Sequence, residues 1–267
     1  MIKTRISRAL RSIGLLQAFD GLNFWLERRK NKASNKGFLI KYPNVALPPD
    51  YLMYESFQLN YNKYYLESLE SAQWISSLAN QYIDLVGAKI LDWGCGPGRV
   101  IRHMKEVIGA ECELHGTDYN KSSIEWCNKN LQGINFNLNG IEAKLPCSNN
   151  TFDLIYGISI FTHLSEEKHF EWYEELYRIL GVNGIMILTT QGDNFKIKLS
   201  EDELENYESG ALVVRGNVKE GHRTYSAFQP KSFMESLFSN ARIESHVVRN
   251  QIPGRALPQD VWIVRKT

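Results

Sequence analysis

The sequence predicts an α/β fold in which short strands alternate with amphipathic helices. One observation is the stretch from Lys89 to Lys105, where a short apolar strand leads through a glycine turn into a helix that begins near Arg99. A second is the next short strand, residues 113–118, which ends in the acid Asp118. Strands that alternate with helices in this way favour a parallel sheet between two layers of helices. The 267 residues, 43% of them hydrophobic, suffice for one such domain with attached segments.

The turn after the first strand has glycines at alternate positions, in the run Asp92-Trp93-Gly94-Cys95-Gly96-Pro97-Gly98. Glycine turns the chain without a Cβ clash and lets the backbone approach a ligand closely. Between a strand and a helix, such a turn is typical of a site for a nucleotide-like cofactor. A dinucleotide fingerprint would need a third glycine where Arg99 stands, so the spacing disfavours a dinucleotide with its pyrophosphate.

This Asp-x-Gly-x-Gly-x-Gly turn resembles the first motif of the class I S-adenosylmethionine-dependent methyltransferases. The later motifs resemble the same family in their order, over about residues 64–267. The resemblance implies a Rossmann-like three-layer αβα sandwich with a seven-stranded, mostly parallel sheet, an antiparallel last strand and an N-terminal helical cap within residues 1–63. It also implies S-adenosylmethionine as the cofactor, contacted through Asp92, Gly94, Cys95, Gly96 and Gly98.

Further cofactor contacts are expected where the second, third and fourth strands end. Asp118, with Tyr119 beside it, is placed to accept both ribose hydroxyls, and it can also serve as the N-cap of a helix over residues 122–130. Ser159 follows the fourth strand, at the edge where ligands bind in such sheets. In the resembled family an Asp after the third strand bonds the adenine amino group, and the residues near that position here are Asn139, Gly140 and Ile141.

Three residues are candidates for a general base. His163, in the loop after the fourth strand, has the right chemistry near neutral pH, and it equally suits a buried histidine that fixes its loop by a backbone hydrogen bond. His222 and Tyr225 lie in an insertion at about residues 191–229. We expect this insertion over the mouth of the site, where it would select the acceptor.

The N-terminal residues are strongly basic, and the rest of the chain is mildly acidic. Residues 1–41 hold ten Lys and Arg against Asp20 and Glu27, a balance of +8, whereas the whole chain carries +1. The first 19 residues have the pattern of a basic amphipathic helix, and residues 28–36 are expected to form a solvated linker. Two interpretations stay open: the helix packs its apolar stripe on the body, or residues 1–30 contact an anionic membrane surface or an acidic partner.

The segment before the first strand is rich in proline and then in aromatic residues. It predicts an extended stretch from residue 42 that turns into a helix near Asp50. A second, amphipathic helix is expected from Leu66 to Val86, with Gly87 as its stop. Since the corresponding segment covers the cofactor in the resembled family, its tyrosines are candidates for the cavity wall, namely Tyr51, Tyr61 and Tyr65.

The four cysteines, Cys95, Cys112, Cys127 and Cys147, are widely spaced and have no clustered histidine partners. This pattern favours reduced thiols over a disulfide frame or a zinc site, so no metal is expected. No apolar run approaches the roughly 20 residues of a membrane span, and arginines interrupt the apolar core that a secretion signal needs. The sequence therefore predicts a cytoplasmic protein, and it leaves open whether this protein also contacts the inner face of the membrane.

The expected reaction is methyl transfer to a nucleophile, to which the protein mainly contributes alignment of donor and acceptor. No Asn/Asp-Pro-Pro-Tyr/Phe motif, the family's mark for amino groups in bases, follows the fourth strand, which disfavours nucleic acid. The chain resembles bacterial small-molecule methyltransferases, which implies O-methylation of a sugar, a glycan precursor or another small metabolite. The alternatives are an RNA or protein methyltransferase that docks through the basic arm, and a binding subunit without activity. The sequence carries no signal for an oligomeric state.

Overall fold

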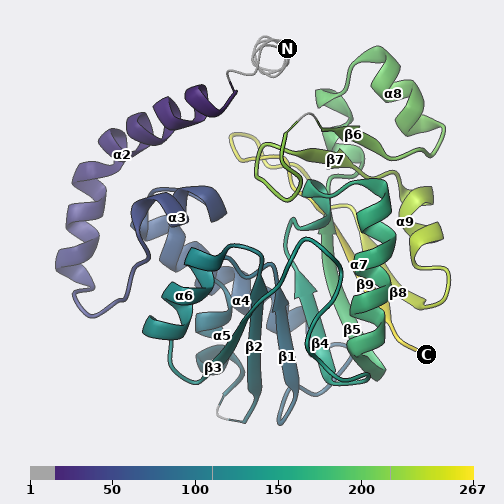
Figure 1. Ribbon diagram of the computed structural model, residues 1–267, viewed down its shortest axis with the longest axis horizontal. Helices are drawn as coiled ribbons and strands as arrows, with labels where there is room; N and C mark the ends of the chain where they lie inside the picture. Colours follow the sequence, from purple (N-terminus) through teal and green to yellow (C-terminus); the bar gives the residue numbers. More distant parts are fainter. Residues whose placement is uncertain (1–15, 110, 217) are drawn as a thin grey trace.

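The computed structural model describes residues 16–109, 111–216 and 218–267, and a seven-stranded sheet lies at its centre (Figure 1). The order across this sheet is β3-β2-β1-β4-β5-β9-β8. Neighbours from β3 to β5 pair in parallel, and β9 is antiparallel to both β5 and β8. The predicted sheet with its antiparallel last strand is confirmed. The strands are β1 (Lys89–Trp93), β2 (Glu113–Asp118), β3 (Ile134–Leu138), β4 (Phe152–Gly157), β5 (Leu180–Thr190), β8 (Arg242–Val247) and β9 (Asp260–Arg265).

Helices cover both faces of the sheet, so that this part of the chain has three layers (Figure 1). Successive residues of β1 point to opposite faces, because Ile90 joins one apolar cluster and Leu91 the other. Strands buried on both faces need apolar residues at nearly every position, as in Phe152–Gly157. One face carries α4 (Ser68–Ala79), α5 (Ile101–Ile108) and α6 (Lys121–Asn130), and the other α7 (Glu166–Ile179) and α9 (Lys231–Leu237).

The helices after β2 and β4 begin at side-chain caps. Asn120 accepts the Ser123 N–H at the start of α6, and Ser165 accepts the Lys168 N–H at the start of α7. The N-cap role considered for Asp118 is therefore wrong, since Asn120 fills it. The Asp118 carboxylate at the end of β2 is therefore not the cap of α6.

The described part of the N-terminal cap contains two helices, α2 (Leu16–Lys41) and α3 (Asp50–Ser56), which pack against each other (Figure 1). The solvated linker expected at residues 28–36 is wrong, because α2 runs through this stretch without a break. Of the basic helix predicted over the first 19 residues, residues 1–15 lie outside the described part of the chain.

Two asparagines explain why residues 28–36 are helical and attached. The Asn60 side chain donates to Asn31 Oδ1 at 2.9 Å, and the Tyr61 N–H donates to Asn35 Oδ1 at 2.9 Å. Asn31 and Asn35 are one helical turn apart and both are buried, so they form one polar seam with the chain that follows α3. A seam made of amides has no hydrophobic period, which is why the sequence pattern indicates solvent there.

The helix expected from Leu66 to Val86 is shorter than predicted. A π-helical turn, η1 (Lys63–Glu67), leads into α4, which ends at Ala79. The chain then forms turns, from which Leu85 still reaches the core. Gly87, with a φ of +74°, belongs to the last of these turns and is not the stop of the helix.

The segment between β5 and α9 forms a small unit near the carboxyl ends of the strands (Figure 1). Its two short strands, β6 (Val213–Arg215) and β7 (Ser226–Phe228), pair with each other and not with the main sheet. They pack with η3 (Asp193–Lys198) and α8 (Glu201–Glu208) around a small core of Phe195, Tyr207, Val213 and Phe228. This unit spans the range predicted as an insertion.

Two further observations concern the described residues as a whole. None of their helices combines the length and the apolar character that a membrane span requires. Their His, Cys, Asp and Glu side chains form no group of three or more that could hold a metal ion. All four cysteines are free thiols.

Candidate active site

A cavity of about 460 Å³ lies at the carboxyl ends of β1, β2 and β4. The chain crosses from one side of the sheet to the other between β1 and β4, since β2 and β3 lie on one side of β1 and the later strands on the other. A crevice forms at such a switch point and is a usual ligand site. A smaller pocket of about 60 Å³ adjoins this cavity and shares Gly94, Asp118 and His163 with it.

The backbone fixes the carboxylate of Asp118 at the end of β2. Its Oδ2 accepts the Gly96 N–H at 2.8 Å, and its Oδ1 accepts the Asn120 N–H at 2.7 Å. Burial raises the pKa of Asp118, and the two N–H groups oppose this rise. Gly96 has a φ of +53°, and a Cβ there would lie 3.1 Å from Ser56 Cβ, so the turn needs glycine. Each carboxylate oxygen keeps a lone pair for a ligand in the cavity.

Asp92 lies at the end of β1 and lines the same cavity. Burial raises the pKa of Asp92 to about 7, and the positive charge of Arg99 holds the rise back. Arg99 itself lies 4.6 Å from the Phe57 ring centre and donates to Ser68 Oγ at 3.3 Å, so its guanidinium is engaged with the cap and with the start of α4. A buried carboxylate in this state would gain from a cationic ligand, which stabilises its charged form.

The predicted cofactor residues come together in the two pockets, with one exception. The larger cavity is lined by Asp92, Gly94, Cys95, Gly96, Asp118, Tyr119 and Ser159, and the smaller pocket by Asn139, Gly140 and Ile141. Gly98 lines neither pocket, and this prediction is corrected: a Cβ there would lie 2.6 Å from Leu131 Cδ1. Its glycine allows the start of α5 to pack closely against the core.

The smaller pocket is an apolar slot with Trp93, Ile160 and Trp172 in its wall. Such a slot suits a flat aromatic group. The amide of Asn139 at this pocket is engaged within the protein, because its Oδ1 accepts from Thr117 Oγ1 at 2.7 Å and its Nδ2 donates to the Gly140 carbonyl at 2.6 Å. Asn139 therefore offers fewer free groups to a ligand than its position in the sequence indicates.

His163 ends the short helix η2 (Phe161–His163) and lines both pockets. Its Nδ1–H donates to the Tyr225 carbonyl at 2.8 Å, since a carbonyl can only accept. Burial lowers the pKa of His163, so the ring is neutral at pH 7 and carries its lone pair on Nε2. No hydrogen bond to a residue of the described chain occupies this nitrogen. The backbone bond and a role as a base are thus compatible.

The two other candidate bases have different surroundings. His222 lines the cavity, its Nδ1 accepts the Thr224 N–H at 3.3 Å, and its Nε2 lies 3.8 Å from Glu55 Oε1. Tyr225 lines neither pocket, and burial raises the pKa of its phenol. The predicted catalytic phenol is therefore corrected: Tyr225 contributes the carbonyl that orients His163.

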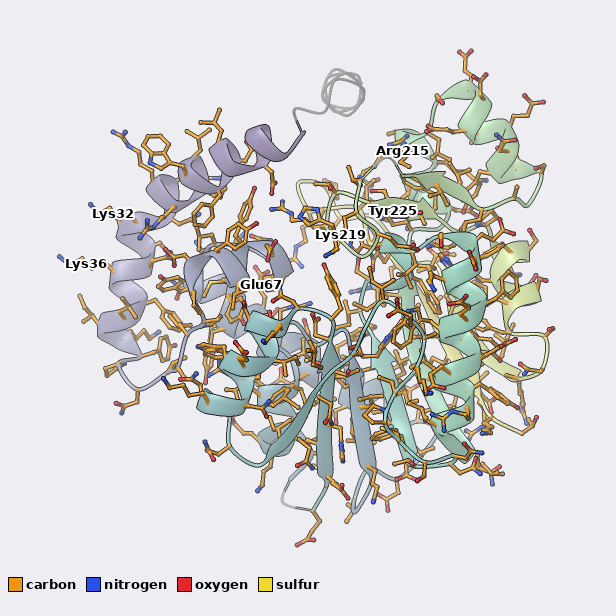
Figure 2. The ribbon with its side chains drawn as sticks, viewed as in Figure 1. Lys32, Lys36, Glu67, Arg215, Lys219 and Tyr225 are labelled. Carbon is orange, nitrogen blue, oxygen red and sulfur yellow. The ribbon has the colours of Figure 1, made fainter. Side chains whose placement is uncertain are left out.

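A set of polar contacts, which we call the cap–insertion bridge, joins the N-terminal cap to the insertion beside the cavity. The guanidinium of Arg223 lies 3.3 Å from Asp20 Oδ1 and 4.1 Å from the Tyr54 ring centre. The Tyr54 hydroxyl also donates to Asp20 Oδ1, at 3.0 Å. Figure 2 shows Lys219 and Tyr225 of the insertion on the side that faces the cap. Arg223 lines the cavity as well, so the bridge forms part of its wall.

The cap contributes cavity residues that the sequence analysis missed. Leu52, Glu55 and Ser56 line the cavity from one side of α3, followed by Phe57. Their spacing of three and four residues is the signal that could have found them, because it marks one face of a helix.

The three tyrosines predicted for the cavity wall lie elsewhere. Tyr61 donates to Asp50 Oδ1 at 2.6 Å, and Tyr65 packs edge-on against His103. Tyr51 is half exposed and lies outside both pockets. These rings stabilise the cap because they pack within it and against α5, and they take no part in the wall.

Comparison with known proteins shows what the chain is similar to. Residues 90–184 match the family model of a methyltransferase domain. The chain is 32% identical to a sterol 24-C-methyltransferase of Schizosaccharomyces pombe, over 37% of this chain and 26% of that protein. It is 31% identical to a phosphoethanolamine N-methyltransferase of Plasmodium falciparum, over 45% of this chain and 45% of that protein. It is 30% identical to a malonyl-[acyl-carrier protein] O-methyltransferase of Legionella pneumophila, over 43% of this chain and 41% of that protein. The chain thus spans less than half the length of these curated relatives.

Solved structures share the fold. A SAM-dependent methyltransferase from Methanosarcina mazei aligns with a TM-score of 0.54 and 16% identity, over 71% of this chain and 96% of that one. An S-adenosylmethionine-dependent methyltransferase from Clostridium acetobutylicum aligns with a TM-score of 0.52 and 14% identity, over 73% of this chain and 90% of that one. At such identities the likeness concerns the fold alone.

Proposed function

We propose that this chain, whose residues 90–184 match the family model of a methyltransferase domain, transfers a methyl group from S-adenosylmethionine to a hydroxyl group of a small molecule. The acceptor that we propose is a sugar, a glycan precursor or a comparable polar metabolite. The observation that carries the choice of a hydroxyl is His163, a neutral imidazole in the cavity wall with its Nε2 lone pair unoccupied by the described residues.

The residues of the cavity fit S-adenosylmethionine in three respects. Asp118 offers fixed carboxylate oxygens, which suit two neighbouring ribose hydroxyls. Asp92 offers a buried carboxylate to a cationic ligand. The apolar slot beside Asp118, with Trp93 and Trp172 in its wall, suits a flat base.

When bound, S-adenosylmethionine would supply an electrophilic methyl group on a sulfonium sulfur, which the acceptor oxygen would take up with its own electron pair as the S–C bond breaks. The chain aligns the acceptor and takes its hydroxyl proton. His163 Nε2 accepts this proton, and the Tyr225 carbonyl holds the ring and stabilises the imidazolium through Nδ1–H.

The wall of the cavity towards the insertion supports a polar acceptor. Glu55, His222 and Arg223 all line it, and they offer both donors and acceptors of hydrogen bonds to a molecule with several hydroxyl groups. The names of the similar proteins refer to a sterol, to phosphoethanolamine and to a malonyl group, so they favour no single acceptor. Charged side chains in the wall disfavour a sterol, because burying them against a hydrocarbon skeleton costs free energy.

The test combines a binding and a transfer measurement. Calorimetric titration should show micromolar binding of S-adenosylhomocysteine to the wild type and none of NAD. Transfer of labelled methyl groups is then screened over a panel of sugars and sugar nucleotides, with matched amines as controls. Binding of NAD in place of S-adenosylhomocysteine would overturn the methyltransferase proposal. Transfer to amines alone would overturn the choice of a hydroxyl.

A further inference from the structure

Helix α2 presents a basic and apolar surface to the outside of the molecule. Leu22 and Trp25 are 53% and 52% exposed, although large apolar side chains are usually buried. Figure 2 shows Lys32 and Lys36, further along the helix, pointing away from the body. We call this surface the outer face of α2; its members recur at three and four residues and are Leu22, Trp25, Leu26, Arg29, Lys32 and Lys36.

The opposite side of α2 is already used by the protein. Its buried Asn31 and Asn35 form the polar seam with the body, and Phe38 is buried as well. The acids of the helix are on this side too: Asp20 belongs to the cap–insertion bridge, and Glu27 Oε2 accepts from Asn31 Nδ2 at 3.1 Å. The outer face is therefore left with cations and apolar side chains, and it has no acid of its own.

We propose that the outer face of α2 docks onto the surface of an anionic lipid bilayer. A helix that carries Lys and Arg together with Trp and Leu on one side lies in the interface, with its apolar groups among the acyl chains and its cations at the headgroups. The Arg29 guanidinium lies 5.5 Å from the Trp25 ring centre, so the two interfacial anchors are side by side. The sequence adds four more cations before α2, namely Lys3, Arg5, Arg8 and Arg11, and no acid before Asp20.

The aliphatic side chains favour a membrane over RNA as the occupant. Cations and an aromatic ring also suit a nucleic acid, where the ring would stack on a base. Leu22, Leu26 and the 74% exposed Ile40 have no such use, because phosphates and sugars give them no apolar contact. In a bilayer they leave water together with Trp25, which is the gain that surface binding needs.

Vesicle sedimentation with the full chain tests the proposal, without cofactor or acceptor. The wild type should bind vesicles of phosphatidylcholine with about one third phosphatidylglycerol, bind pure phosphatidylcholine much more weakly, and dissociate as salt is raised. The double variant K32E/K36E should bind anionic vesicles about 30-fold more weakly or worse. W25A/L26A should lose about 10-fold or more, and W25F should lose part of the tryptophan quenching by brominated lipid.

The matched control is K105E/K129E, which makes the same change of charge at exposed lysines of α5 and α6. It should bind within about twofold of the wild type. Wild-type binding by K32E/K36E or W25A/L26A, or an equal loss in the control, would overturn the proposal. A chain that ignores vesicles but binds single-stranded RNA through Lys32 and Lys36 would assign the face to nucleic acid. Titration with S-adenosylhomocysteine shows separately that each variant is folded.

Discussion

The two halves of the cavity are held in different ways. In the cofactor half, formed by the glycine turn and the ends of β1 and β2, backbone N–H groups fix the Asp118 carboxylate. In the acceptor half, formed by α3 and residues 221–223, side chains from distant parts of the chain hold one another, such as Asp20 and Arg223. Backbone bonds at the end of a sheet are preorganised, whereas side-chain contacts between a cap and an insertion can open and close. We therefore expect the acceptor proposed above to enter through the second half.

The largest effect is expected from Asp118→Asn, which attacks the cofactor half. The amide removes the charge and sets one NH₂ group against a backbone N–H, so the affinity for S-adenosylhomocysteine should fall about 100-fold or more. Calorimetry measures this loss. Lys121→Ala is the control, because it removes only an exposed ion pair with Glu125 on α6, and it should change the affinity less than about threefold. Near-wild-type binding by Asp118→Asn would contradict the division into two halves.

His163 lies where the halves meet, and His163→Gln should lower kcat about 100-fold while it leaves the affinity for S-adenosylhomocysteine nearly unchanged. Burial lowers the pKa of His163 from its usual 6.5, so the wild-type kcat/KM should stay level at neutral pH and fall only on the acid side of 6.5, where Nε2 binds a proton. The pH profile of kcat/KM measures this fall in activity at acid pH. His222→Gln should show the same fall, and an unchanged fall in His163→Gln would exclude His163 as the base.

Asp92→Asn should remove one pH-dependent contribution to the free energy of unfolding. The folded carboxyl has a pKa of about 7 and the unfolded one about 4, so the folded state holds the extra proton between these values and stability falls as pH rises through them. From about pH 5.5 to about pH 8.5 the wild type should lose roughly 2 kcal/mol relative to Asp92→Asn. Urea unfolding of both proteins at the two pH values measures this difference. A constant difference would show that Asp92 is ionised throughout.

The smallest effect is expected in the acceptor half, from Arg223→Ala. This change removes one ion pair and one ring contact of the cap–insertion bridge, which together stabilise it by about 1 kcal/mol. The KM for the acceptor should rise about fivefold with little change in cofactor affinity, as steady-state kinetics would show. Lys231→Ala, at an exposed ion pair of α9, is the control. A larger loss of cofactor affinity than of acceptor affinity would mean that the bridge belongs to the cofactor half.

The same difference explains which parts of the site the sequence predicts. Asp92, Gly96 and Asp118 come together because each lies at or just after the carboxyl end of one of two neighbouring parallel strands, and this relation is visible in the chain itself. Glu55 and Arg223 come to line one cavity only after α3 and the insertion are packed, which no local pattern contains. Gly98 follows the same alternation as Gly94 and shares its positive φ, yet a Cβ there would meet Leu131 of the core and not the cavity.

At the N-terminus, too, the sequence did not predict contacts that form only when distant parts of the chain pack together. The sheet and its helices were predicted because their hydrophobic periods are strong. The middle of α2 was not, since buried asparagines carry its inner side and resemble solvated residues in the sequence. Polar packing of this kind has to be seen in the structure.

Strand β9 has a consequence for the order in which the protein can assemble during synthesis. It is translated after β8 but lies between β5 and β8, so β8 leaves the ribosome before the neighbour that joins it to the sheet exists. Gln259, just before β9, donates to Ser159 Oγ at 2.7 Å and accepts from Thr189 Oγ1 at 2.6 Å. All residues that line the cavity are translated before Gln259, yet Ser159 in its wall gains its bond to Gln259 only once this late segment has been inserted.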